Sequence, residues 1–122
     1  MRAAAFALLM LVLLPASAQT VIVYSHADAD AANRVRQIAR AYDVVLMDGD
    51  ITPGEPWRAT VAEWIASART IVILWSAAAA QSPEVGAEWR QALASGARVV
   101  PIMLDSTPLP GELAARQAVD WR

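Results

Sequence analysis

Short apolar runs alternate with amphipathic patterns along most of this chain. Four runs rich in β-branched residues lie at 21–24, 44–47, 71–75 and 99–104. They are short enough for strands, and none alternates apolar with polar residues, which is typical of strands buried on both faces of a sheet. The pattern therefore predicts four parallel strands, with a short fifth strand expected at 118–121.

Helical periodicity separates these runs. Apolar residues recur at helical spacing from Asp28 to Tyr42, from Pro56 to Arg69 and from Ser82 to Ser95. A brief further helix is expected after residue 110. Strands and helices in this order predict an α/β fold, a flavodoxin-like open parallel sheet of about five strands with helices on both faces.

Two consequences follow from this sheet. Pro101 lacks the N–H that a strand ladder needs, so we expect it at a strand end or bulge. Ligands of such sheets bind beyond the carboxyl ends of the strands. The residues expected there are Ser25 and His26, the loop 48–56, Trp75 and Ser76, and Asp105 and Ser106.

The first 18 residues differ from the rest. Arg2 gives a basic start, residues 3–14 are apolar, and residues 16–18 read Ala-Ser-Ala, a pattern typical of signal-peptide cleavage. The apolar run is shorter than the roughly 20 residues that cross a bilayer. We expect a signal peptide or hydrophobic leader at 1–18 and a domain at 19–122. A cleaved chain is then exported, periplasmic or secreted, with only transient membrane contact; an uncleaved one is membrane-associated or cytoplasmic.

Composition narrows the chemistry. The 122 residues contain no cysteine, which excludes disulfides, thiolate metal sites and a cysteine nucleophile. His26 is the single histidine, so no histidine metal cluster is possible and no metal is expected. The net charge is −2 and basic residues do not cluster, which argues against nucleic acid as a partner.

The strand ends carry motifs that resemble those of bacterial Toll/interleukin-1 receptor (TIR) domains. The matching segments are Val-Ile-Val-Tyr-Ser-His-Ala-Asp at 21–28, Asp48 with Ile-Thr-Pro-Gly-Glu-Pro-Trp at 51–57 (the family's BB loop), Ile-Leu-Trp-Ser at 73–76, Ser82, Glu88, and Val-Pro-Ile-Met-Leu-Asp at 100–105. A receiver domain shares this architecture, but it needs acidic residues after the first strand, an aspartate after the third and a late lysine. Here those places hold Ser25-His26 and Ser76, and the chain has no lysine.

The resemblance implies a specific chemistry. Glu88 matches the catalytic glutamate of NAD-cleaving TIR domains, where a carboxylate near the ribose stabilises an oxocarbenium-like transition state. The helix pattern independently puts Glu88 at the edge of a buried stripe formed by Val85, Trp89 and Ala92. The residues that the resemblance and the strand-end rule place around the substrate are Ser25, His26, Asp48, Trp57, Trp75, Ser76 and Glu84. The sequence departs from the family at Glu84, where NAD-cleaving members often have an aromatic residue, and in lacking a final helix after the fifth strand.

Two functions therefore stay open. The first is cleavage of NAD(P) at the nicotinamide–ribose bond, with NAD as substrate and no cofactor. The second is a non-catalytic adaptor that signals by binding other TIR domains or by self-association. A gene fragment with an accidental leader is a third interpretation.

Several residues also have plain structural interpretations. Glu88 can be a solvated helix residue paired with Arg36 or Arg90, and His26 can help to cap the first helix. Asp48 and Glu55 can be ordinary turn residues. Trp64 and Trp89, and also Trp75, can belong to the core.

Overall fold

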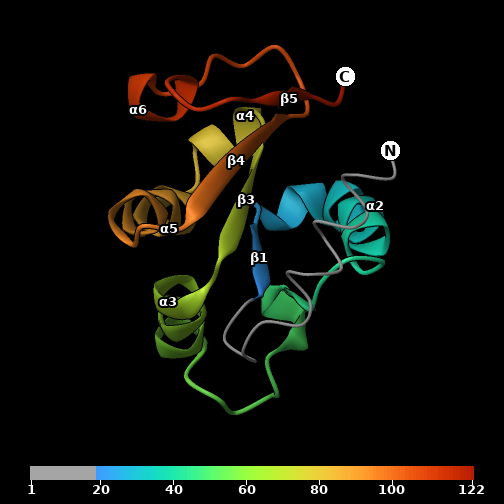
Figure 1. Ribbon diagram of the computed structural model, residues 1–122, viewed down its shortest axis with the longest axis vertical. Helices are drawn as coiled ribbons and strands as arrows, with labels where there is room; N and C mark the ends of the chain where they lie inside the picture. Colours follow the sequence, from blue (N-terminus) through green and yellow to red (C-terminus); the bar gives the residue numbers. More distant parts are fainter. Residues whose placement is uncertain (1–18) are drawn as a thin grey trace.

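The computed structural model describes residues 19–122, which form a parallel five-stranded sheet in the order β2-β1-β3-β4-β5 (Figure 1). The strands are β1 (Thr20–Val23), β2 (Val45–Leu46), β3 (Thr70–Trp75), β4 (Arg98–Met103) and β5 (Val119–Asp120). The helices are α2 (Ala29–Ala39), α3 (Trp57–Ser67), α4 (Ala77–Ala80), α5 (Pro83–Ala94) and α6 (Gly111–Ala114), with 3₁₀ turns η1 (His26–Asp28) and η2 (Asp48–Asp50). The predicted fold class is confirmed; the predicted leader at 1–18 lies outside the described residues.

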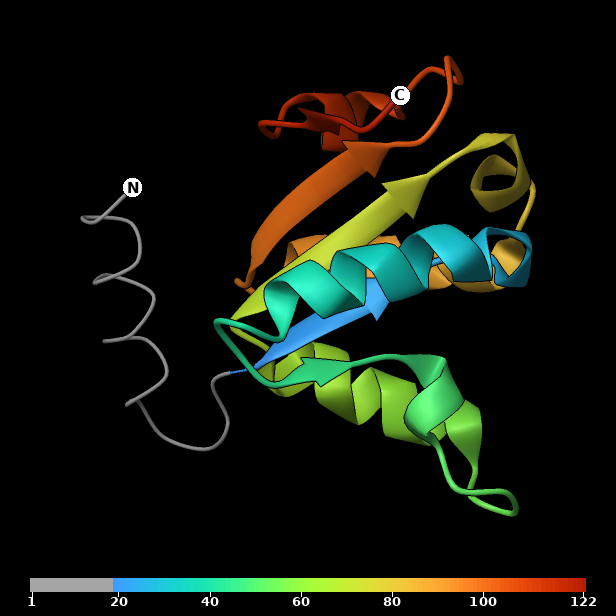
Figure 2. The ribbon, with the colours of Figure 1, turned by 90° about the vertical axis from the view of Figure 1, so that its right-hand side faces the viewer.

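The helices cover both faces of the sheet. Helices α3 and α5 lie on one side of the strands and α2 on the other, as Figures 1 and 2 both show. The α3 and α5 side packs Ile65, Trp89 and Ala92 against Ile71 and Ile73. On the opposite side, one cluster joins α2 to the sheet: Ile22, Ala31, Ala32, Val35, Val45, Met47, Val72, Leu74 and Ile102. The central strands β1 and β3 are thus buried from both sides, as their apolar runs predict, whereas both residues of the edge strand β5 are exposed.

β4 departs from the prediction at Pro101. This proline is buried inside β4, in register with Ile73 of β3, and not at a strand end or bulge. The backbone N–H groups of successive residues in a strand point alternately to its two neighbours. Because the N–H of Leu104 donates to Trp75 of β3, the nitrogen of Pro101, three residues earlier, faces the β5 side. Pairing with β5 starts only at Ile102. Pro101 is therefore tolerated inside β4, because β5 does not pair with β4 at this residue and no ladder hydrogen bond is lost.

β2 is shorter than predicted, with two residues in place of four. Its expected first residue, Val44, is 62% exposed. The backbone N–H of Val44 bonds to the Asp43 side chain instead of a neighbouring strand. Within residues 19–122, no helix is long and apolar enough to cross a membrane.

Candidate functional site

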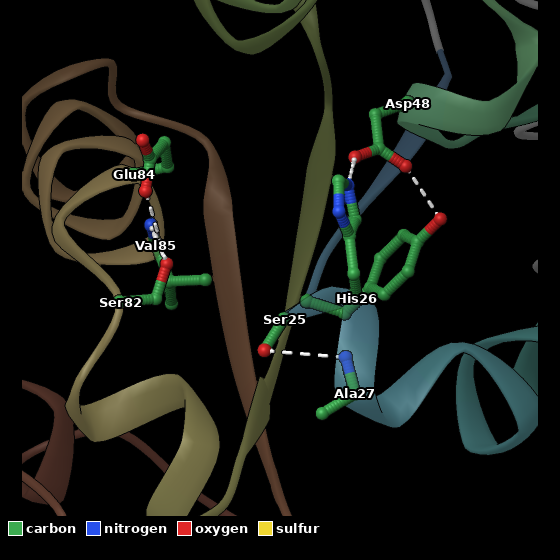
Figure 3. Close-up of polar contacts among 8 residues, drawn as sticks. Ser25, His26, Ala27, Asp48, Ser82, Glu84 and Val85 are labelled. Carbon is green, nitrogen blue, oxygen red and sulfur yellow. Dashed lines mark hydrogen bonds and ion pairs between the residues drawn. The ribbon is translucent and has the colours of Figure 1, made fainter.

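A cleft lies beyond the carboxyl ends of β1 and β2, where α5 begins. It has a volume of about 270 Å³ and is lined by Tyr24, Ser25, His26, Asp48, Trp57, Ser82, Glu84 and Glu88. Figure 3 shows His26 and Asp48 on one side of the β3 ribbon, with Ser82 and Glu84, at the start of α5, on the other side. Six of the eight residues predicted from the sequence meet here, because parallel strands release their chains at one edge of the sheet.

Asp48 is the polar centre of the strand-end side. Its carboxylate accepts hydrogen bonds from the Tyr24 hydroxyl and, over 2.8 Å, from Nε2 of His26. Burial and then the contact with Asp48 raise the pKa of Tyr24 above its usual value. The His26 side chain is 86% exposed and points into the open cleft, whereas Asp48 is 26% exposed. The cap of η1 is made by Ser25, which accepts from Ala27, so His26 is not the helix cap.

A second carboxylate anchors the loop that carries Asp48. Asp50 accepts two hydrogen bonds from one Arg36 nitrogen, at 2.6 and 2.7 Å, and a third from the Met47 N–H at 2.9 Å. These bonds tie the start of the loop to α2. Beyond them the loop is exposed and turns at Gly54, whose φ of 96° strongly favours glycine.

α5 places Glu88 through its N-terminal cap. The Ser82 hydroxyl accepts from the Val85 N–H at 3.2 Å, and Pro83 occupies the first turn. Val85 and Trp89 are buried, which fixes the rotation of the helix. Glu88 is consequently half-buried at the edge of this stripe, as the helical pattern predicts.

The surroundings of Glu88 are apolar and acidic. A narrow gap beside it is lined by Val21, Ile22, Tyr24, Asp48, Val61 and Trp64. Burial, then the carboxylates of Asp48 and Glu84, raise the pKa of Glu88 from 4.5 to about 7, and His26 opposes this shift. The alternative ion pairs of Glu88 do not form, because Arg36 binds Asp50 and the Arg90 guanidinium lies over the Trp89 ring.

Two further depressions adjoin the cleft through shared lining residues. A groove of about 410 Å³ between α3 and α5 is lined by Trp57, Arg58, Val61, Ala62, Pro83, Glu84, Ala87, Glu88 and Gln91. A smaller depression of about 240 Å³ lies among His26, Asp48, Gly49 and Trp57. Trp57, 41% exposed, lines all three spaces and offers a flat aromatic surface at their junction.

Comparison with known protein families shows to which family the chain belongs. The family model described as the TIR domain matches residues 21–122, which is most of the chain and all five strands but for Thr20. The chain belongs to the TIR domain family. Among solved structures, it is similar to the TIR domain of a Toll-related receptor from the lower metazoan Hydra magnipapillata. That match has 18% identity and a TM-score of 0.72, and it covers 84% of this chain and 82% of the other. Curated proteins gave no match.

Two residues predicted for the site of this TIR domain lie elsewhere. Trp75 is buried in the core at 4% exposure and its Nε1 donates to the Pro108 carbonyl at 2.9 Å. The Ser76 hydroxyl donates to Asp28 and caps α4 by accepting from the Ala79 N–H. Neither lines the cleft, because β3 continues past the end of β1, and Trp75 and the following Ser76 therefore lie beyond it. The contacts of both side chains are structural, and the predicted substrate contact of Trp75 and Ser76 has no counterpart in the lining of this cleft.

Three residues were not predicted from the sequence: Tyr24 in the cleft, Trp64 in the narrow gap beside Glu88 and Arg58 in the groove between α3 and α5. Tyr24 ends an apolar run and was assigned to the strand, although its hydroxyl is the only feature separating it from a core phenylalanine. Trp64 was assigned to the core, and it does pack there while also bordering Glu88. Nothing in the sequence except its position next to Trp57 indicates that Arg58 lines the groove.

Proposed function

We propose that this TIR domain cleaves NAD(P) at the nicotinamide–ribose bond, with Glu88 as the catalytic carboxylate. One observation carries the proposal: Glu88 is a half-buried acid in a cleft, with a pKa raised to about 7 and, among residues 19–122, no hydrogen bond or ion pair to its carboxylate. A structural glutamate on a helix is normally solvated or paired. An acid kept unpaired and desolvated at a cleft is instead typical of a functional site.

The chemistry fits the surroundings of Glu88. As the C1′–N1 bond breaks, its electron pair leaves with nicotinamide and positive charge develops on the ribose ring. An ionised Glu88 stabilises that charge, and the apolar walls strengthen the interaction. Water then adds to C1′ and loses a proton, giving ADP-ribose and nicotinamide. In this proposal the exposed ring of Trp57 stacks on the nicotinamide or the adenine ring.

The test is release of nicotinamide by the purified full-length chain, measured by chromatography at several pH values. We expect Glu88→Gln to abolish release. Glu63→Gln, which changes an exposed glutamate of α3, is the matched control and keeps it. In the wild type, kcat/KM should rise with pH through about 7, because ionised Glu88 is the active form. Equal rates for wild type and Glu88→Gln refute the assignment.

The second candidate is an adaptor that acts by association with other TIR domains or with itself. One observation favours it: the loop from Thr52 to Pro56 and the adjoining Trp57 are exposed. The resemblance adds that Glu84 stands where NAD-cleaving members often have an aromatic residue. Absence of nicotinamide release together with concentration-dependent association in light scattering, lost on Trp57→Ala, supports the adaptor instead.

A further inference from the structure

The cleft and the groove beside it are rich in acids. Asp48, Glu84 and Glu88 line them, and the basic side chains among their described lining residues are His26 and Arg58. A dinucleotide carries two negative phosphates between its riboses. With the nicotinamide ribose at Glu88, the pyrophosphate lies one ribose away, where carboxylates repel it. A cation must therefore face the pyrophosphate if such a ligand is to bind.

Arg58 is the basic residue that is available for this task. Its guanidinium lies 3.6 Å from the Glu84 carboxylate, longer than the roughly 2.7–2.9 Å of a charge-assisted hydrogen bond. The side chain is 78% exposed, so opening this ion pair costs little. The guanidinium carbon also lies 5.4 Å from the centre of the Trp57 ring, within range of a cation–π contact.

His26 is a poorer candidate. Its Nε2 is held at 2.8 Å by Asp48, a carboxylate that would itself repel a phosphate placed beside the imidazole. Asp48 holds His26 at 2.8 Å, whereas Glu84 lies 3.6 Å from the Arg58 guanidinium, so a phosphate has the looser ion pair to open at Arg58. This difference favours a ligand that runs from Glu88 into the groove between α3 and α5, which Arg58 lines.

We infer that Arg58 binds the pyrophosphate of the dinucleotide and that Glu84 holds the guanidinium in place when no ligand is bound. This inference rests on the proposed function, since it takes the ligand to be NAD(P). It gives Arg58 a role in binding and none in bond cleavage. It also makes Glu84 a competitor of the phosphates, so its negative charge weakens binding of the ligand.

The experiment compares ligands with and without the pyrophosphate. ADP-ribose binding to the full-length chain is measured by calorimetry, and KM and kcat are measured for NAD and for nicotinamide riboside. Arg58→Gln should raise the Kd of ADP-ribose and the KM of NAD roughly tenfold, the effect of losing one exposed charge-assisted contact, with kcat unchanged. The same variant should leave the KM of nicotinamide riboside unaltered, because that ligand has no phosphate.

Two other variants complete the test. Glu84→Gln should lower the Kd of ADP-ribose by releasing Arg58. Arg34→Gln, on the exposed surface of α2, is the matched control and should change nothing. An unchanged Kd in Arg58→Gln overturns the inference, as does a loss confined to His26→Gln or a wild type that does not bind ADP-ribose. Binding of ADP-ribose through Arg58 without nicotinamide release refutes the proposed function alone.

Discussion

Replacing Glu88 by glutamine should stabilise the domain at high pH and leave it unchanged at low pH. Gln has nearly the shape of a protonated Glu but never ionises. The folded protein raises the pKa of Glu88 from 4.5 to about 7, mainly through burial. The folded state therefore holds this proton more tightly than the unfolded state does.

The sign and size follow from that difference. Between pH 4.5 and about 7 the folded state binds more protons than the unfolded state, so the free energy of unfolding falls as pH rises through this window. One pKa unit corresponds to roughly 1.4 kcal/mol, which gives an upper limit of about 3 kcal/mol above the window. Because Glu88 is only half-buried, solvent screens the effect and we expect about 1–2 kcal/mol.

The assay is urea unfolding of wild type, Glu88→Gln and Glu63→Gln at pH values from 4 to 8. Glu88→Gln should gain about 1–2 kcal/mol over wild type at pH 8 and nothing at pH 4. Glu63→Gln, exposed on α3, should follow wild type throughout. A Glu88→Gln variant less stable than wild type at pH 8, or one with a constant difference at every pH, would contradict the buried and unpaired environment described for Glu88.

Two more substitutions examine how the cleft is held. Arg36→Gln removes the partner of Asp50 and should cost about 1–2 kcal/mol, since both side chains are partly buried; hydrogen exchange should also show faster opening of the loop after Asp48. Loop exchange at the wild-type rate would show that the ion pair does not anchor it. Tyr24→Phe deletes one of two donors to Asp48 and should lower the free energy of unfolding by about 1 kcal/mol, measured by urea titration, with a higher KM for NAD. A stability equal to wild type would mean that water replaces the hydroxyl at no cost.

The place of Glu88 was predictable because a helix has one strict period. Once Val85 and Trp89 are identified as buried, geometry leaves Glu88 at the edge of their stripe. The meeting of His26 with Asp48 was predictable for a similar reason, since neighbouring parallel strands end at one edge.

Trp75 and Tyr24 show where such reasoning stops. In a strand that is apolar throughout, no polar residue marks which face is which, so the sequence does not tell whether a terminal aromatic faces core or cleft. β3 is longer than β1 and extends beyond its end, so that Trp75 and Ser76 lie away from the cleft. Packing across the sheet, and not the local sequence, sets this difference in length. The position of Pro101 inside β4 is possible only because β5 starts to pair at Ile102, and no local sequence pattern indicates where that pairing starts.

The strand order also dictates when the domain can fold. β3 lies in the middle of the sheet, between β1 and β4, so its ladders join residues 20–23 to 70–73 and residues 70–75 to 98–103. A growing chain therefore has no complete central sheet until residue 103 has left the ribosome, and loop closure over such separations makes folding slow. Until residue 75 has been made, β1 has only the two-residue β2 beside it. Most of the native parallel pairing therefore forms only after the greater part of the chain has been synthesised.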